Sequence, residues 1–213
     1  MFKRILLTSL FILTACTPTP AAPPPVNTPQ VLKIHASAAA QPWLFEAFDC
    51  ADKLHIFLFD TNDPEAAEIN IRIGEPDQLT APAFQIDQED LLVVTHRENP
   101  LQNLTAEEVR LLFSNPNAEI QTWVYALSED VQQVFAKIMM KGQGITSLAR
   151  IAGTPQQMSD IINQDKNAVG LLPVHWKAGT MRVIFTIPGI PVLAITKSKP
   201  AGQTQALLEC LQK

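Results

Sequence analysis

The sequence predicts an α/β fold in which most neighbouring strands run parallel. Short runs rich in Val, Ile and Leu alternate along the chain with segments that open on helix-capping residues. This alternation is typical of strands joined by crossover helices. The hydrophobic fraction of 46% is that of an ordinary globular chain. Residues 31–213 are numerous enough to form one sizeable domain or two small lobes.

Strands are expected where β-branched residues gather in short apolar runs. The clearest is 91–95, Leu-Leu-Val-Val-Thr, which is typical of a buried central strand. In 67–73 the apolar residues alternate and place Ile69, Ile71 and Ile73 on one face, as in a half-buried strand. The other expected strands are 31–36, 54–59, 120–126, 168–172, 182–187 and 192–196.

Helices are expected where a capping residue precedes an apolar periodic segment. Thr105 and Glu108 have the spacing of a capping box, in which each residue satisfies a backbone amide of the other. Ser128 is expected to cap a helix over 128–140. The remaining helices are expected over 43–51, from 154 onward and over 202–211.

The N-terminus has the layout of a bacterial export signal. A basic start precedes the apolar segment 5–13, which is shorter than the roughly 20 residues that a membrane-spanning helix needs. The segment ends in Leu13-Thr14-Ala15-Cys16, which resembles a bacterial lipobox. Residues 1–15 are therefore expected to be a lipoprotein signal peptide, with fatty acyl chains on Cys16. The alternative is an ordinary signal peptide cut at an A-x-A-like site.

A proline-rich linker is expected to follow Cys16 over residues 16–30. Residues 17–29 contain six prolines, and such a composition gives an extended, semi-rigid spacer. The expected location is the cell membrane, with the protein anchored by lipid only and the folded part on the extracytoplasmic side.

The charge argues against nucleic acid as a partner. Cleavage before Cys16 would remove two basic residues and leave 14 basic against 21 acidic residues, a net charge of −7. An acidic protein repels the phosphate backbone and gains nothing from anionic lipid headgroups.

The remaining cysteines and the histidines indicate no cofactor and no catalytic set. Cys50 and Cys210 would lie in an oxidising compartment and either form one disulfide or stay as two buried thiols. No Cys-x-x-Cys, Gly-x-Ser-x-Gly or phosphate-loop motif occurs, and the four histidines are scattered without metal-ligand spacing. The sequence therefore gives no support for an enzyme, a metal site or a cofactor.

Four stretches, taken in order, resemble one known family. Residues 90–96 read Asp-Leu-Leu-Val-Val-Thr-His, and 99–114 continue with Asn-Pro-Leu-Gln-Asn-Leu-Thr-Ala-Glu-Glu-Val-Arg-Leu-Leu-Phe-Ser. Residues 167–173 read Asn-Ala-Val-Gly-Leu-Leu-Pro, and 191–197 read Pro-Val-Leu-Ala-Ile-Thr-Lys. This order resembles the phosphate-type periplasmic solute-binding proteins of ABC transporters, over roughly residues 31–213.

The resemblance implies a type II periplasmic-binding-protein-like fold. Two small α/β lobes would be joined by two crossover strands, with a ligand cleft between them. Lobe 1 is expected over 31–95 plus 190–213 and lobe 2 over 96–189, with crossings near 95–100 and 188–191. This assignment puts Cys50 and Cys210 in the same lobe, which favours their bridge without settling it.

The resemblance also implies three places that contact a ligand. The first is the turn after the first strand, with Ser37 and Ala38. The second is the loop after the third strand, with Gly74 and the neighbouring Arg72, and the third is Ser128 at a lobe 2 helix. Hydroxyls, backbone amides and an arginine are the donors that an oxyanion needs. A plain helix cap for Ser37 and a solvated side chain for Arg72 remain alternatives.

At the third place the sequence departs from the family. The Ser-Gly-Thr turn of the family is here Ser128-Glu129-Asp130. Two carboxylates at the position of an anion would repel phosphate if they were desolvated. The departure argues against phosphate and leaves a neutral ligand, a cationic ligand or no ligand open.

Two functions follow as hypotheses. The first is a lipid-anchored extracytoplasmic solute-binding protein, a monomer that closes two lobes over a small molecule or anion and has an ABC permease as its candidate partner. The second is a degenerate binding-protein fold that acts as a cell-surface adaptor or sensor without a transport role.

Overall fold

The structure is a computed structural model and describes residues 31–115 and 119–212. The expected signal peptide, Cys16 and the proline-rich linker lie outside the described residues.

One mixed sheet of eight strands runs through the molecule in the order β2-β1-β3-β8-β4-β7-β5-β6. The outer neighbours are parallel, whereas β8 and β4 at the centre run antiparallel to each other and to β3 and β7. The expectation of mostly parallel neighbours is therefore wrong at the centre of the sheet. The strands are β1 (Val31–Ala36), β2 (Phe57–Asp60), β3 (Ile69–Ile73), β4 (Ala83–Thr95), β5 (Gln121–Val124), β6 (Arg150–Ile151), β7 (Ala168–Pro173) and β8 (Arg182–Thr196).

The two long central strands join two halves of the molecule. The first part of β4 pairs with the last part of β8, beside β3, whereas Leu91–Thr95 pairs with β7 and with the first part of β8. Pairing is irregular between Glu89 and Leu91, where Gly189 of β8 has a φ of +69° and donates its backbone N–H to Asp90 Oδ1 at 2.9 Å. The strands thus pass between the lobes at this irregularity.

The pairing differs in two respects from the sequence expectations. Leu91–Thr95 lies with the second half of the sheet, although residues up to 95 were assigned to lobe 1. The segments 182–187 and 192–196 are one continuous strand, β8, which passes through Pro188 and Pro191. Alternation and strand propensity mark where a chain is extended, but they do not show which neighbour it pairs with.

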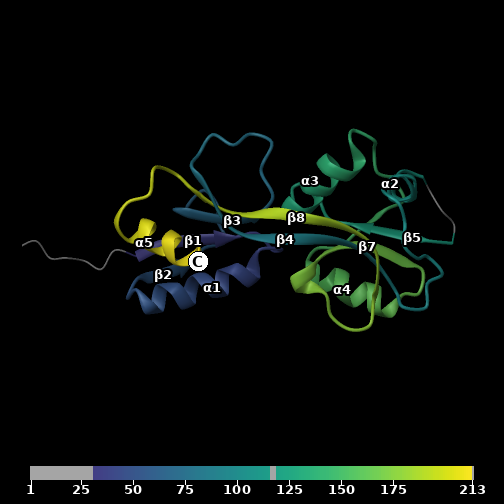
Figure 1. The fold of residues 1–213 in the computed structure, drawn as a ribbon, viewed down its shortest axis with the longest axis horizontal. Helices are drawn as coiled ribbons and strands as arrows, with labels where there is room; N and C mark the ends of the chain where they lie inside the picture. Colours follow the sequence, from purple (N-terminus) through teal and green to yellow (C-terminus); the bar gives the residue numbers. More distant parts are fainter. Residues whose placement is uncertain (1–30, 116–118, 213) are drawn as a thin grey trace, which may run out of the picture.

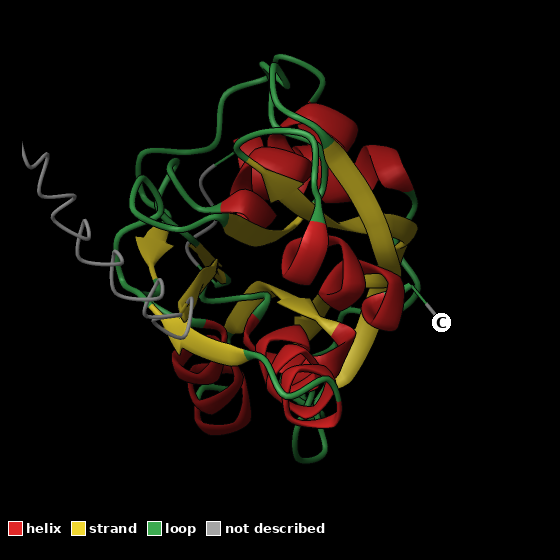
Figure 2. Ribbon diagram, turned by 90° about the vertical axis from the view of Figure 1, so that its left-hand side faces the viewer, coloured by secondary structure: helices red, strands yellow, loops and turns green. Residues whose placement is uncertain are grey.

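Helices cover the two halves of the sheet differently. In Figure 1, α1 (Gln41–Lys53) and α4 (Pro155–Gln164) lie below the sheet, and α2 (Ala106–Ser114) and α3 (Asp130–Phe135) lie above its second half. Above the first half, Figure 1 shows loop rather than helix. Figure 2 looks along the long axis from the first lobe and shows helices on both sides of the strands.

The upper face of the lobe 1 sheet carries no helix because one strand connection in this lobe is short. Parallel strands are usually connected by a crossover of a dozen or more residues, most often a helix. Here residues 61–68 alone connect β2 to β3, which lie on opposite sides of β1, and they contain no helix. This short loop leaves part of the sheet face beside it open.

The helix termini agree with the capping patterns in one case and not in another. Thr105 caps α2, and both reciprocal bonds of the capping box with Glu108 are present. The prediction that Ser128 caps the next helix is wrong, because α3 begins at Asp130 with Glu129 as its N-cap and has no side-chain cap. A π-helical turn, η1 (Ala136–Met140), continues α3.

A disulfide resolves the alternative that the sequence left open. Cys50 of α1 and Cys210 of α5 (Gly202–Leu211) are bonded, across a sequence separation of 160 residues. The bond fixes the last helix of the chain to the first, and both belong to the lobe 1 half of the sheet.

Candidate functional site between the lobes

Three segments that are distant in the sequence meet at the carboxylate of Asp130. Ser37, in the turn after β1, donates its hydroxyl to Oδ2 at 2.6 Å. Ile73, at the end of β3, donates its backbone N–H to the same oxygen at 2.8 Å. Val131 donates its N–H to Oδ1 at 2.7 Å. The carboxylate therefore lies where the three implied ligand-contacting places converge.

Asp130 is a buried charge compensated by hydrogen bonds alone. It is 5% exposed, and no Lys, Arg or His forms a salt bridge with it among residues 31–115 and 119–212. Burying an ion without compensation is costly, so the three donors are what make this position tolerable. The donors come from both lobes, so the same bonds also link the lobes.

Further contacts hold the lobes together around Asp130. Arg72 of β3 donates from Nη2 to Gln133 Oε1 of α3 at 2.8 Å. On the other side, Trp176 donates its indole N–H to the carbonyl of Ala39 at 2.8 Å. These bonds put the two lobes in direct contact on both sides of Asp130.

Gly74 lies where β3 of lobe 1 closely approaches α3 of lobe 2. Its φ is +76°, and a Cβ at this position would come within 2.2 Å of Val134 Cγ2 of α3. Its backbone N–H donates to the carbonyl of Pro191 at 2.7 Å. Only glycine combines this backbone conformation with this contact, and its amide is already engaged within lobe 1.

A cavity of about 500 Å³ opens beside Asp130, on the bare face of the lobe 1 sheet. This volume falls in the range of roughly 300–1,000 Å³ that is usual for small-molecule sites. Lobe 1 and the neighbouring turn of lobe 2 both contribute to its walls. The lining residues are His35, Ser37, Ala38, Pro64, Asn70, Ile71, Arg72, Ser128, Glu129, Asp130 and Ile195.

The structure brings most of the sequence-predicted ligand residues to this cavity. Ser37, Ala38, Arg72 and Ser128 line it, whereas Gly74 does not. The hydroxyl of Ser37 also accepts the Ala40 N–H at 3.2 Å, but Ser37 is not the cap of α1, which has Ala40 as its N-cap and no side-chain cap bond.

Two polar atoms of the lining residues have no partner. Arg72 Nε and Asn70 Oδ1 are buried and lack a hydrogen bond within the described part of the chain. Buried polar groups are normally satisfied, so these two atoms are unused hydrogen-bonding capacity next to the cavity.

The carboxylates give this wall of the cavity an acidic character. Burial, together with the negative charge of Asp130, raises the pKa of Glu129 above its usual value. Burial and the same two carboxylates raise the pKa of the Tyr125 hydroxyl, which donates to the Leu171 carbonyl at 2.8 Å. A positive charge or a hydrogen-bond donor placed here would be favoured, and a further anion would be opposed.

Replacing Glu129 with glutamine is expected to raise the midpoint of thermal unfolding at neutral pH. The raised pKa means that the folded state disfavours the ionised form of Glu129. Its contribution to stability is therefore fully present below the pKa of the unfolded chain and is lost as pH rises through the folded pKa. Unfolding midpoints of both proteins measured between pH 4 and pH 8 should converge at the acid end. An equal or lower midpoint for Glu129→Gln at neutral pH would contradict the assignment.

The point where β4 passes between the lobes contains a second buried carboxylate. Glu89 is 1% exposed and accepts the Val174 N–H at 2.7 Å, and its other oxygen bonds His175 Nδ1. The His175 ring lies 4.7 Å from the ring of Trp43, whose N–H donates to Asp87 Oδ2 at 2.9 Å. This chain of contacts connects α1 of lobe 1 to the segment after β7.

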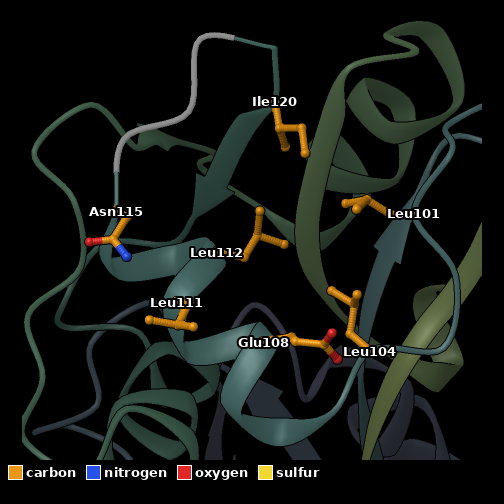
Figure 3. Close-up of a pocket in the computed structure, with 7 residues that line it drawn as sticks. All are labelled: Leu101, Leu104, Glu108, Leu111, Leu112, Asn115 and Ile120. Carbon is orange, nitrogen blue, oxygen red and sulfur yellow. The ribbon is translucent and has the colours of Figure 1, made fainter.

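A groove elsewhere in lobe 2 is apolar and separate from these residues. It has a volume of about 350 Å³ and lies along α2 (Figure 3). Of its two polar lining residues, Glu108 and Asn115, the first is engaged in the capping box of α2. The groove is lined by Leu101, Leu104, Glu108, Leu111, Leu112, Asn115 and Ile120.

The described residues contain neither a cluster of metal ligands nor a helix that could span a membrane. In residues 31–115 and 119–212 no group of His, Cys, Asp or Glu is arranged to hold a metal ion. Over the same residues no helix is both long and apolar enough to cross a membrane.

Some residues around the candidate site carry no sequence motif that would indicate them. Gln133 and Glu89 carry no motif, and Asp130 was noticed only as a departure from a family pattern. From the sequence, the negative charge of Asp130 predicts only that an anionic ligand would be repelled. In the structure, its carboxylate accepts the hydrogen bonds of Ser37 and Ile73 itself.

Solved structures with a similar fold include proteins of two kinds. A putative phosphate ABC transporter substrate-binding protein with bound phosphate from Clostridium perfringens superimposes with a TM-score of 0.73, at 13% identity over 85% of this chain and 93% of that one. An ABC-type phosphate transport receptor from Vibrio cholerae gives 0.66 at 15% identity, over 85% and 93%. The CcmR regulatory domain from Synechocystis in complex with 2-PG gives 0.65 at 13% identity, over 85% and 95%.

These similarities show the class of fold. The chain has a type II periplasmic-binding-protein-like fold, which ligand-binding transport receptors share with regulatory domains, including one of a LysR family regulator from N. meningitidis. No protein-family model matches the sequence, and no curated protein matches it.

Proposed function

We propose that this protein is a lipid-anchored extracytoplasmic binding protein that takes a small ligand in the cavity between its lobes. The observation that carries the proposal is the cavity itself, about 500 Å³, into which four of the sequence-predicted ligand residues converge. The unsatisfied atoms of Arg72 and Asn70 beside it add support, because a ligand could supply their partners after a small adjustment.

The charges of the cavity favour a ligand with a cationic or hydrogen-bond-donating group. Glu129 and Asp130 form one wall, and the donors that would hold an oxyanion already bind Asp130. Free phosphate would meet two carboxylates and few free donors. An amine group facing Glu129 would instead offset the burial and the repulsion from Asp130, which together raise the pKa of this residue.

The proposed location rests on the sequence and is supported by the disulfide. The lipobox-like segment ending at Cys16 predicts lipidation and export. Disulfides persist mainly in oxidising compartments outside the cytoplasm, and the Cys50–Cys210 bond is consistent with such a location. An ABC permease as docking partner and a monomeric state remain parts of the proposal.

A thermal-unfolding panel tests the ligand proposal. Amino acids, polyamines and sugars are compared with phosphate, sulfate and molybdate, on the exported form of the protein. We expect an amine-bearing compound to raise the unfolding midpoint, since a ligand at a hundredfold excess over Kd adds about 2.7 kcal/mol to the stability of the folded state. Phosphate is expected to have no effect.

Variants make the panel specific to this cavity. Glu129→Gln is expected to weaken the shift relative to its own ligand-free midpoint. Glu209 is an exposed glutamate on α5 that accepts a hydrogen bond from Gln205, so Glu209→Gln serves as the control and should leave the shift unchanged. A shift that survives Glu129→Gln unaltered would place the ligand elsewhere.

The adaptor or sensor function is the second candidate, and one observation favours it. The lobes are already bridged by bonds of the kind that a ligand would make, from Ser37 and Ile73 to Asp130. If no compound in the panel shifts the midpoint, solute binding loses its support and the adaptor becomes the better assignment.

A further inference from the structure

We propose that Asp130 is a built-in ligand: its carboxylate occupies a latent oxyanion-binding site and holds the two lobes closed without an external anion. The site consists of the Ser37 hydroxyl and the backbone N–H groups of Ile73 and Val131. This inference concerns the site that Asp130 fills, not the neighbouring cavity, so it does not depend on the ligand proposed above.

The geometry of the donors is the first reason. The three donor–acceptor distances lie between 2.6 and 2.8 Å, which is the range of charge-assisted hydrogen bonds. Two of these donors belong to lobe 1, from the turn after β1 and from the end of β3. The acceptor belongs to the first residue of α3 in lobe 2.

The absence of a cation is the second reason. A buried carboxylate that served only as half of a structural ion pair would have Lys, Arg or His as partner. Arg72, the nearby arginine among the cavity-lining residues, donates to Gln133 instead. In the described residues Asp130 has no ion-pair partner, and its charge is matched by neutral dipoles, as the charge of a bound oxyanion often is.

The tight packing of the lobes is the third reason. A side chain at Gly74 would collide with Val134, and Trp176 reaches across to the Ala39 carbonyl. Both contacts form only where the two lobes lie against each other, and the bonds from Asp130 join the same two surfaces. A carboxylate carried by the chain itself has a high effective concentration at its own site, so the closed state needs no free ligand.

Removing the carboxylate is expected to create an anion site. In Asp130→Ala the hydroxyl of Ser37 and the two N–H groups lose their acceptor. We expect a lower unfolding midpoint, which acetate or inorganic phosphate restores in a concentration-dependent manner. Sodium chloride at equal ionic strength should not restore it, and the unaltered protein should respond to neither anion.

Two further variants keep the experiment decisive. Asp160→Ala removes an exposed aspartate of α4 that bonds only Gln156, and it should change neither the midpoint nor the anion response. The double variant Ser37→Ala with Asp130→Ala lacks one donor and should respond to anions more weakly than Asp130→Ala alone. Small-angle X-ray scattering should show a larger radius of gyration for Asp130→Ala without anion and a smaller one with it.

If Asp130→Ala does not fold, Ser37→Ala in the presence of Asp130 gives the answer. Hydrogen exchange of the Ile73 amide should be slow in the unaltered protein. It should be faster in Ser37→Ala, because the Ser37 hydroxyl helps to hold the same carboxylate oxygen in place against the Ile73 N–H. The proposal would be overturned by an anion that raises the unfolding midpoint of the unaltered protein as much as it raises the midpoint of Asp130→Ala. It would also be overturned by Asp130→Ala with an unchanged midpoint and scattering profile.

The ligand panel and this experiment can fail separately. A panel without any hit leaves the anion response of Asp130→Ala intact, since that response needs only Ser37, Ile73 and Val131. Conversely, an amine ligand could bind beside Glu129 even if Asp130 proves to be no more than a structural residue.

Discussion

Glu89→Ala is expected to lower the free energy of unfolding by about 2–4 kcal/mol, which is large for a single substitution. Glu89 is fully enclosed at the point where β4 passes between the lobes, and it accepts hydrogen bonds from the Val174 and Asp90 backbone as well as contacting His175. Alanine would leave these groups without an acceptor and would open a cavity beneath Trp43 and His175. Denaturant unfolding, followed by fluorescence and circular dichroism, measures the loss.

Two control variants separate the role of the acceptor from that of bulk. Glu89→Gln keeps the shape and one acceptor oxygen for Val174, so its loss should be clearly smaller than that of alanine. Glu209→Ala removes an exposed glutamate of α5 and should change stability by no more than about 0.5 kcal/mol. Equal losses for alanine and glutamine would show that the charge, not the hydrogen-bond acceptor, matters at this position.

Removing the disulfide is the second change with a large expected effect. The double variant Cys50→Ala with Cys210→Ala opens a loop that spans 160 residues. The loss of a native disulfide typically costs about 2–5 kcal/mol, mainly because the unfolded chain gains freedom. For a chain of this size the corresponding drop in the unfolding midpoint is roughly 4–20 °C.

Reduction of the unaltered protein is the matched control for the disulfide. The reduced protein and the double variant lack the same bond, so their midpoints should agree closely. A midpoint of the double variant far below that of the reduced protein would point to lost packing of Cys50, which is 7% exposed, rather than to the lost bond. Unchanged midpoints in both would mean that α5 docks on α1 without help from the bond.

The local structure was predicted best where one segment contains both partners of an interaction. The capping box of Thr105 and Glu108 lies within four consecutive residues and forms as the pattern requires. The first strand and the last helix also have the expected bounds, 31–36 and 202–211. The first part of β4 was missed because 85–90 is polar apart from Ile86, and this segment is extended where it pairs with β8.

The candidate site shows the same difference between what local sequence predicts and what long-range contacts decide. Ser37, Ala38, Arg72 and Ser128 were indicated by a family resemblance, and the structure gathers them around one cavity. The role of Asp130 could not be foreseen, because its partners Ser37 and Ile73 are 93 and 57 residues away in the sequence. Only the folded chain shows that the carboxylate binds those donors.

By itself, the sequence determined the α/β class, most of the segments that become strands and helices, the capping of α2, and the charge at the turn before α3. These properties depend on side-chain chemistry and on neighbours a few residues apart. The tertiary structure decided that the central strands run antiparallel, that Cys50 meets Cys210, and that Asp130 fills the meeting point of the lobes. Each of these depends on contacts between distant segments, which the periodicity of a single segment does not encode.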